Sequence, residues 1–364
     1  MPAIGEHTKL SEYKRRAMGR LILGFQGLEP NQELKEVQQG LDPAGYILFG
    51  RNVDNWEQVL SCNQQLHQLS KANPPLISVD QEGGRVRRIK ATSWPPMRKV
   101  GELNDLTLTK QIIQGINREL LALGFTANWA PCSDVDSNPD NPVIGDRAFH
   151  SNPNICANHV QVAIETMKQM GMMACAKHFP GHGDTDMDSH LDLPTVHKTV
   201  EEIFQCELVP FQRAVESQVD VMMTAHVIFR ALDSEYPATM SAKILDGILR
   251  KKMGYQGVIV SDDMEMKAVR GRYPLDLQLD KSVRAGVDCF LVCSEHQLQQ
   301  ECFETLIALQ EKYPEHRMLA EQSEKRLQTL HVKMQPSALV GDLSLVGCDD
   351  YQQLCEKHWP KSFV

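Results

Sequence analysis

Eight short apolar segments recur along this chain of 364 residues, and stretches with helical character separate them. The apolar segments are residues 20–25, 45–49, 76–79, 125–129, 172–176, 219–223, 258–260 and 287–292. The helical stretches include residues 55–71, 108–123, 154–170, 200–217 and 241–253. Parallel strands need crossover connections, and a helix is the usual crossover. Eight such repeats predict a single-domain α/β fold, a (β/α)8 barrel of the TIM type.

A doubly wound open sheet also alternates strand and helix. The barrel is favoured over it because the segments reach eight and no G-x-G-x-x-G motif follows the first one. Several glycines stand between a helical stretch and the next apolar segment, where they are expected to end the helix. They are Gly124, Gly171, Gly254, Gly257 and Gly286.

One barrel accounts for residues 1–335, including a lead-in before the first strand and a continuous helical region at 295–333. Residues 336–364 form a tail to which no motif assigns a role. The hydrophobic content of 42% supports a sizeable core.

The charge balance is acidic, with 38 Lys and Arg against 47 Asp and Glu and a formal net charge of −9. This argues against nucleic acid or an anionic membrane as a partner. No apolar stretch approaches the roughly 20 residues that span a bilayer, and the N-terminal region lacks the apolar core of a signal peptide. A cytoplasmic location is therefore expected. The ten cysteines, without a C-x-x-C pair, are expected to be free thiols. We expect a monomer or a weak homo-oligomer.

Ionisable residues follow five of the apolar segments, where a barrel of this type places its active site. They are Asp80, Asp134, Lys177 with His178, His226, and Asp262 with Asp263. An aspartate after a strand can instead cap the next helix, a role that suits Asp263 better than Asp262. His226 could equally be a hydrogen-bonded residue of the barrel wall.

The loop at residues 177–194 contains three histidines and four aspartates among glycine and proline, a composition that suits neither a helix nor a strand. Asp188 and His190 within it can act as a coupled pair. A carboxylate beside an imidazole fixes its tautomer and raises its basicity, so the ring can donate and recover a proton near neutral pH. The loop therefore predicts acid–base chemistry.

The same loop has some features of a metal site. The aspartates at alternate positions from 184 to 188 fit the start of a calcium loop, but Ser189 replaces its glycine and Thr195 its final glutamate. His178 and His182 are separated by Phe-Pro-Gly, so they cannot share a helix face as a zinc motif requires. No metal and no other cofactor is expected.

Four motifs together resemble the bacterial β-N-acetylglucosaminidases of glycoside hydrolase family 3. They are D-Q-E-G-G-R-V-x-R at 80–88, V-I-G-D-R-A-F at 143–149, K-H-F-P-G-H-G-D-T-x-x-D-S-H at 177–190 and S-D-D at 261–263. They occur in the family's order, and the resemblance covers residues 20–300.

The resemblance implies a retaining glycoside hydrolase that removes terminal β-N-acetylglucosamine from peptidoglycan fragments during cell-wall recycling, without a cofactor. Its small-molecule substrates would be N-acetylglucosaminyl-1,6-anhydro-N-acetylmuramic acid and the corresponding muropeptides. The implied nucleophile is Asp262, the general acid and base is His190, and the partner of that histidine is Asp188. The implied substrate contacts are Asp80, Arg88, Arg147, Lys177 and His178.

Elementary acid–base chemistry is consistent with these implied roles. A retaining glycosidase needs one ionised group to attack and one protonated group to donate. An aspartate and a histidine differ in intrinsic pKa, so the two roles need little tuning.

Other interpretations remain open at this stage. Arg88 and Arg147 could form structural ion pairs with Asp80, Glu82 or Asp146. The enzyme could act on another β-glycoside or use phosphate as its acceptor, since a neutral imidazole would not repel that anion. The barrel could also bind a glycan without turning it over.

Overall fold

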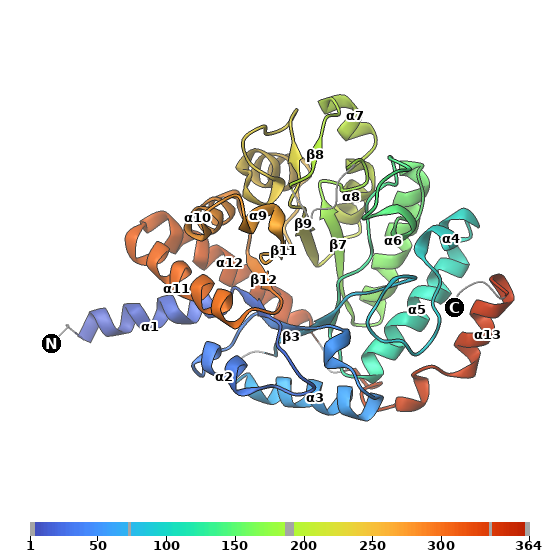
Figure 1. Ribbon diagram of the computed structural model, residues 1–364, viewed down its shortest axis with the longest axis horizontal. Coiled ribbons are helices and arrows are strands. Elements are labelled where there is room, and N and C mark those ends of the chain that lie inside the picture. The colour runs from blue at the N-terminus through green and yellow to red at the C-terminus, as the bar shows by residue number, and fades with distance from the viewer. Residues whose placement is uncertain (1–3, 72–73, 186–192, 335–336, 361–364) are drawn as a thin grey trace.

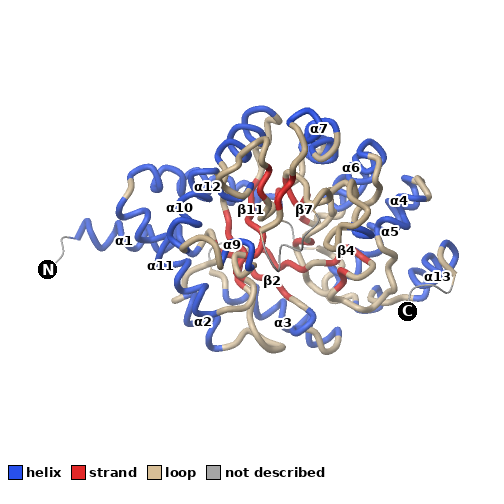
Figure 2. The backbone as a smooth tube through the Cα atoms, turned by 45° about the horizontal axis from the view of Figure 1, so that its top comes forward, coloured by secondary structure: helices blue, strands red, loops and turns tan. Residues whose placement is uncertain are grey.

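The computed structural model describes residues 4–71, 74–185, 193–334 and 337–360. Within them, eight parallel strands close into a barrel that helices surround (Figures 1 and 2). The barrel strands are β1 (Leu21–Leu23), β2 (Gly45–Leu48), β3 (Leu76–Val79), β6 (Ala127–Asn128), β7 (Met173–Phe179), β9 (Val221–Thr224), β11 (Val258–Asp263) and β12 (Cys289–Val292). They follow one another around the barrel in chain order, and β12 pairs with β1. The predicted fold class is confirmed.

Each predicted apolar segment overlaps one barrel strand, but β9 ends one residue later than predicted and two strands run three residues further. β7 continues through Lys177 and His178, and β11 continues through Asp262. In both strands the register shifts against a neighbour near this polar end. The predicted site residues at these positions therefore belong to the strands themselves and not to loops that follow them.

The alternation of side chains along the strands divides the core into two layers. One cluster fills the barrel interior and includes Ile22, Met223 and Leu291. The second lies between the strands and the surrounding helices and receives the neighbouring residues of the same strands, such as Leu23 and Phe290. Because both faces of every strand are covered, the strands are apolar without a polar alternation.

The surrounding helices have the following bounds. They are α1 (Ile4–Met18), α2 (Gln32–Gln38), α3 (Trp56–Leu69), α4 (Met97–Glu102), α5 (Leu106–Ala122), α6 (Pro153–Gln169), α7 (Val200–Gln205), α8 (Leu208–Glu216), α9 (Lys267–Arg270), α10 (Leu275–Ala285), α11 (His296–Lys312), α12 (Pro314–Lys333) and α13 (Asp349–His358). Leu327 and Leu330 of α12 join the interior cluster, so this helix covers the amino end of the barrel.

Two predicted helices are interrupted, which corrects the sequence analysis. The region 295–333 divides at Tyr313, which is extended (φ −123°, ψ 118°) because the proline that follows disfavours helical backbone there. The region 200–217 divides at Cys206, whose φ of −125° and ψ of −77° are not helical. The predicted helix at 241–253 is present as the π-helical segment η4 (Lys243–Lys252).

Four of the five predicted helix-ending glycines have the expected left-handed backbone, and Gly257 does not. A Cβ at Gly257 would lie 2.4 Å from Oη of Tyr255 and 2.7 Å from the carbonyl oxygen of Asp220. This glycine is therefore explained by close packing just before β11, and its predicted role as a helix cap is wrong.

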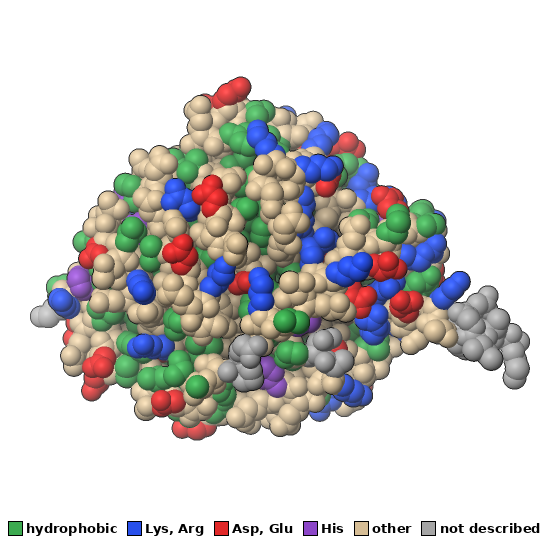
Figure 3. Space-filling view, turned by 180° about the vertical axis from the view of Figure 1, so that it is seen from behind, with side chains coloured by type: hydrophobic (Ala, Val, Ile, Leu, Met, Phe, Trp, Pro, Cys, Tyr) green, Lys and Arg blue, Asp and Glu red, His purple; other side chains and the backbone are tan. Residues whose placement is uncertain are grey.

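The surface carries charges of both signs. On the face seen in Figure 3, Lys and Arg side chains are interspersed with Asp and Glu side chains. No helix in the described part of the chain has both the length and the apolar composition needed to cross a bilayer. All ten cysteines are free thiols, and most of them are buried.

His159 of α6 provides a test of how pH acts on the fold. Its Nδ1 lies 2.7 Å from Oγ1 of Thr109, and its ring stacks on Phe149 with the centroids 5.3 Å apart. Burial lowers the pKa of His159 from 6.5 to about 4. Between those values the unfolded chain binds a proton here that the folded protein does not, so stability is expected to fall as the pH is lowered from about 6.5 to 4.

We expect a His159→Phe variant, which keeps an aromatic ring in this position, to lose less of its unfolding free energy between pH 7 and 5 than the parent. The expected difference is on the order of 1 kcal/mol, measured by urea denaturation at both pH values. Equal losses in the two proteins would show that His159 does not contribute to the pH dependence.

Candidate active site

The candidate site is a cavity of about 280 Å³ at the carboxyl ends of the barrel strands. Its walls come from β2, β3, β6, β7, β9, β11 and β12 and from the loops that follow them. The lining includes Phe49, Asp80, Arg88, Trp129, Arg147, Lys177, His178, His182, Met223, Asp262, Asp263 and Cys293. Six predicted site residues therefore meet in one place: Asp80, Arg88, Arg147, Lys177, His178 and Asp262.

The floor of this cavity is largely apolar. Ile47, Trp129, Met223 and Leu291 lie there and belong to the cluster that fills the barrel interior. Trp129 is 1% exposed, and its indole Nε1 has no hydrogen-bond partner among the described residues. A buried N–H without a partner is costly, and Trp129 is one of the residues that line the cavity.

One wall is organised by Glu82, which the sequence analysis did not include among the site residues. It lies in β4 (Gln81–Gly83), which pairs with β5 (Val86–Arg87) in a small antiparallel hairpin. Arg147 donates to both of its carboxylate oxygens, at 2.9 and 2.8 Å, and Nζ of Lys177 lies 2.8 Å from Oε1. Burial opposes ionisation of Glu82, but the charges of Arg147 and Lys177 outweigh it and hold its pKa well below the usual range.

Lys177 is shared between two carboxylates. Its Nζ donates to Oδ1 of Asp80 at 2.7 Å as well as pairing with Glu82. Burial would lower the pKa of Lys177, but these two carboxylates raise it, so the ammonium group stays charged. Asp80 also lies 3.5 Å from Nη2 of Arg88, whose buried Nε has no partner among the described residues.

The alternative interpretation of the arginines is therefore partly confirmed. Arg147 forms a structural ion pair with Glu82, and Arg88 pairs with Asp80. Both arginines nevertheless line the cavity. Each can serve the structure and still present donors to a ligand.

Asp134 contacts two histidines, His178 at the end of β7 and His182 in the loop that follows. Its fully buried carboxylate lies 2.8 Å from Nδ1 of His178 and accepts the backbone N–H of His182 at 2.7 Å. Burial would raise the pKa of Asp134, but His178 lowers it to about 2, so the group is ionised at neutral pH. This contact places the proton of His178 on Nδ1 and leaves Nε2 to accept from Nη2 of Arg147 at 3.4 Å.

The two neighbouring aspartates of β11 have pKa values that shift in opposite directions. Burial opposes ionisation of Asp262, but electrostatic interactions with His178 and His226 and a hydrogen bond from the backbone N–H of Asp263 lower its pKa. Burial and the charge of Glu265 raise the pKa of Asp263 to about 7. Asp262 is therefore the ionised carboxylate of this pair at neutral pH.

Asp263 accepts backbone N–H bonds from Glu265 at 3.1 Å and Cys293 at 3.3 Å, in the turn before α9. It satisfies backbone donors of the turn, but Met266 occupies the helix cap, so the predicted capping role of Asp263 is wrong. His226 is a wall residue: its Nδ1 lies 2.9 Å from Oγ1 of Thr239 and its Nε2 lies 3.2 Å from the carbonyl oxygen of Asp263.

The base of the polar loop is packed against the barrel. A Cβ at Gly183 would lie 1.6 Å from the carbonyl oxygen of Val135, so only glycine allows this approach. Asn141 donates to the carbonyl oxygens of His182 and Thr185, both at 2.8 Å. The predicted acid–base pair, Asp188 and His190, lies outside the residues that the structure describes.

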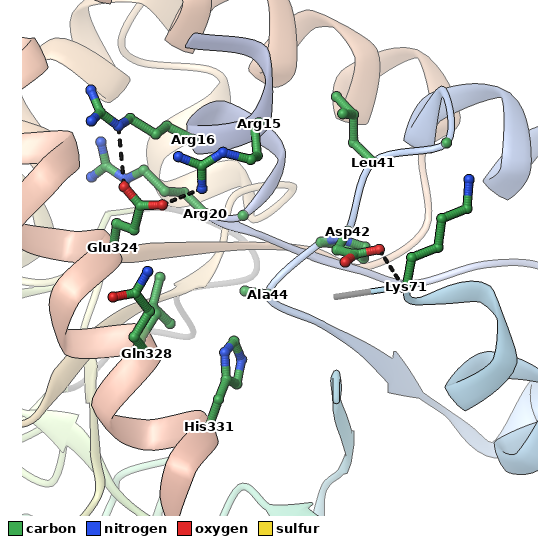
Figure 4. A pocket seen from close by; sticks show the side chains of 14 residues that line it. Arg15, Arg16, Arg20, Leu41, Asp42, Ala44, Lys71, Glu324, Gln328 and His331 are labelled. Atoms are coloured by element: carbon green, nitrogen blue, oxygen red, sulfur yellow. Dashed lines mark hydrogen bonds and ion pairs between the residues drawn. The ribbon is translucent and has the colours of Figure 1, made fainter. Parts of the chain in front are cut away.

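A second cavity lies at the amino end of the barrel (Figure 4). It is lined by charged groups, but Arg15 and Arg16 both point toward Glu324 and pair with it. Lys71 donates its backbone N–H to Asp42. The arginines are thus neutralised within the protein, and this cavity is not the candidate site.

Comparison with known proteins shows which family this chain resembles. Residues 12–330 match the model of the glycosyl hydrolase family 3 N terminal domain. A β-hexosaminidase of Nitrosomonas eutropha is 36% identical over 270 residues, which are 72% of this chain and 77% of that protein. β-Hexosaminidase A of Pseudoalteromonas piscicida is 38% identical over 284 residues, 71% of this chain, but the match spans only 47% of that protein.

Solved structures agree. The glycoside hydrolase family 3 β-N-acetylglucosaminidase of Paenibacillus sp. str. FPU-7 superposes with a TM-score of 0.88 and 33% sequence identity, covering 95% of this chain and 68% of that one. The similarity therefore extends over the barrel and its cavity.

Proposed function

The chain belongs to glycoside hydrolase family 3, and from this premise we propose that it is a retaining β-N-acetylhexosaminidase acting on peptidoglycan fragments. It removes the terminal non-reducing β-N-acetylglucosamine from N-acetylglucosaminyl-1,6-anhydro-N-acetylmuramic acid and its peptides. A role in cell-wall recycling in the cytoplasm is part of the proposal. The observation that carries it is an ionised, half-buried Asp262 in a cavity whose polar wall also includes the paired side chains of Asp80, Arg88, Arg147, Lys177 and His178.

Asp262 attacks the anomeric carbon while the bond from that carbon to the leaving oxygen breaks. His190 donates a proton to the leaving oxygen, and Asp188 stabilises the charged imidazole before the transfer. The products of this step are the released fragment and a glycosyl ester on Asp262. His190 then takes a proton from water, which attacks the anomeric carbon from the opposite side and restores the free carboxylate. Two inversions retain the β configuration.

The sugar is held by Asp80, Arg88, Arg147, Lys177 and His178. Asp80 accepts hydrogen bonds from hydroxyl groups, and the cations and the imidazole offer donors and an acceptor around it. Glu82 and Asp134 hold these side chains at fixed positions, as their buried contacts indicate. A site that is ordered before the substrate arrives loses less entropy on binding.

We expect Trp129 to donate its indole N–H to the substrate. A Trp129→Phe variant should have a kcat/KM about fivefold lower, which corresponds to a hydrogen bond of roughly 1 kcal/mol. Its melting temperature should fall modestly, because phenylalanine leaves part of the buried indole volume unfilled. An unchanged kcat/KM would contradict this role.

We expect a His190→Ala variant to distinguish substrates by their leaving groups. Without a proton donor, hydrolysis of a disaccharide should slow by about 10²- to 10⁴-fold, whereas 4-nitrophenyl N-acetylglucosaminide should suffer much less because its leaving group is a weak base. The matched control is His197→Ala, which replaces an exposed histidine that follows His190 in the sequence. It should change neither rate. Equal losses on both substrates would remove His190 from the proton-donor role.

The proposed function is tested by comparing 4-nitrophenyl N-acetylglucosaminide with the corresponding glucoside, each with and without phosphate, and by following a 1,6-anhydro-muropeptide by NMR. We expect a preference for the N-acetyl sugar, no acceleration by phosphate, and release of the β-anomer first. Equal rates on both sugars would reject the N-acetyl preference. A glycosyl phosphate product would identify a phosphorylase, and α-anomer released first would exclude retention.

A further inference from the structure

The tail beyond α12 has a defined place in the fold. Its described part, residues 337–360, contains the short helix η5 (Leu343–Leu345) and α13, and it lies beside α5 on the outside of the barrel (Figure 1). Tyr351 and Cys355 of α13 are buried in the outer core layer. The tail is thus packed against the barrel, and it contacts the loop that follows β5.

The first contact is a buried carboxylate that joins the tail to a loop near the active site. Glu119 of α5 accepts the backbone N–H of Gly347 at 2.9 Å from the tail. The same carboxylate accepts Nε1 of Trp94 at 2.7 Å and the hydroxyl of Thr92 from the loop after β5. The side chain of Glu119 is fully buried, so these bonds are shielded from water.

Two further contacts reach the same loop. The ring of Tyr351 packs against Trp94, with the centroids 5.4 Å apart. Nε2 of Gln352 donates to the carbonyl oxygen of Ala91 at 3.2 Å. The tail and the loop are therefore joined by a hydrogen bond, by an aromatic contact and by the carboxylate of Glu119, which binds both.

The loop held in this way carries Arg88 into the cavity. On its inner side, Oε1 of Gln81 accepts the backbone N–H groups of Arg88 at 2.8 Å and Ile89 at 3.0 Å. The carbonyl oxygen of Trp94 accepts the N–H of Gly84 at 3.0 Å, which closes the loop on itself. Gln81 thus fixes the backbone of Arg88 directly. The tail contacts the same loop from outside the barrel, at Ala91 and Trp94.

We propose that residues 337–360 form a strap that positions the Arg88 loop for substrate binding. The strap touches no reacting atom and acts through Arg88. The proposal rests on the proposed function, because Arg88 contacts the sugar only if the cavity binds one. Since Arg88 would contact the sugar in both the ground state and the transition state, a looser loop should raise KM and leave kcat nearly unchanged.

The test uses the full chain with Tyr351→Ala and, as a milder change, Gln352→Ala. KM for 4-nitrophenyl N-acetylglucosaminide should rise about five- to tenfold in the first variant and less in the second, with kcat within about twofold of the parent. Tyr351→Phe keeps the ring and should restore the parent KM. Tyr313→Ala is the matched control, because this partly buried tyrosine contacts His316 and not the loop.

A double-mutant cycle shows whether the strap acts through Arg88. In an Arg88→Ala background, Tyr351→Ala should raise KM no further. Equal KM increases in both backgrounds would overturn the proposal, as would a Tyr351→Ala variant that merely loses stability like the Tyr313→Ala control. An inactive parent would overturn the proposed function and the strap with it, whereas an active parent with unchanged variants would overturn the strap alone.

Discussion

Replacing Asp262 by asparagine is expected to lower kcat on 4-nitrophenyl N-acetylglucosaminide by about 10⁴-fold or more, because the amide cannot form the glycosyl ester. The substitution preserves shape, and its Oδ1 can still accept the backbone N–H of Asp263, which lies 2.8 Å away in the parent. The melting temperature should therefore change little. A competent Asp262→Asn enzyme would exclude Asp262 as the nucleophile.

Asp263→Asn is the matched control, since it makes the same change one residue further along. Its Oδ1 can keep the two backbone bonds of Asp263, and the parent carboxyl, with a pKa of about 7, is already partly neutral at neutral pH. We expect a rate loss below about tenfold, or about 1.4 kcal/mol. Trapping the parent with a 2-fluoro glycoside and weighing its peptides should place the label on Asp262, and a label elsewhere would contradict the ester.

The largest expected loss of stability comes from Glu82→Gln. The substitution removes the carboxylate that pairs with Arg147 and one of the two carboxylates that pair with the buried Lys177, and breaking a buried ion pair typically costs about 3–5 kcal/mol. KM should also rise, because both cations are proposed to hold the sugar. Urea denaturation and steady-state kinetics at pH 7 measure the two effects.

The pH dependence of this loss has a definite sign. Because the folded pKa of Glu82 lies below its unfolded value, its contribution is complete above about pH 5 and is lost as the pH falls through the folded value. The difference in unfolding free energy between the parent and the Glu82→Gln variant should therefore be constant above pH 5 and become smaller in stronger acid. Glu324→Gln, in a more exposed ion pair with Arg15 and Arg16, should cost less than about 1 kcal/mol. Equal costs for the two variants would contradict the role of burial.

The barrel could be predicted because its strands are short apolar segments at regular intervals, and that pattern depends only on local sequence. The ends of β7 and β11 could not, because Lys177, His178 and Asp262 are too polar for a buried strand unless they are paired. The partners of Lys177 and His178 lie elsewhere in the chain: Asp80 directly follows β3, Glu82 is in the hairpin after it, and Asp134 is in the loop after β6. Pairing between distant segments decides where these strands end, and a local pattern does not contain it.

Glu82 and Trp129 were missed for a related reason. Glu82 precedes two glycines and has the local signature of an exposed turn, yet its side chain is 1% exposed. Trp129 has the signature of a core residue, which it is, and only its unpartnered Nε1 marks it as a candidate ligand contact. The tail was unassigned because its anchor, Glu119, lies more than 200 residues earlier in the chain.

The packed interior of the barrel has a consequence for polymeric substrates. Leu327 and Leu330 cover one end, and Trp129, Met223 and Leu291 form the floor beneath the other. A glycan therefore cannot pass through the barrel and has to enter and leave at the end where the cavity lies. We expect long chains to be shortened one unit per encounter from a single terminus, with the freed monosaccharide leaving through the opening by which it came and competing there with the next chain.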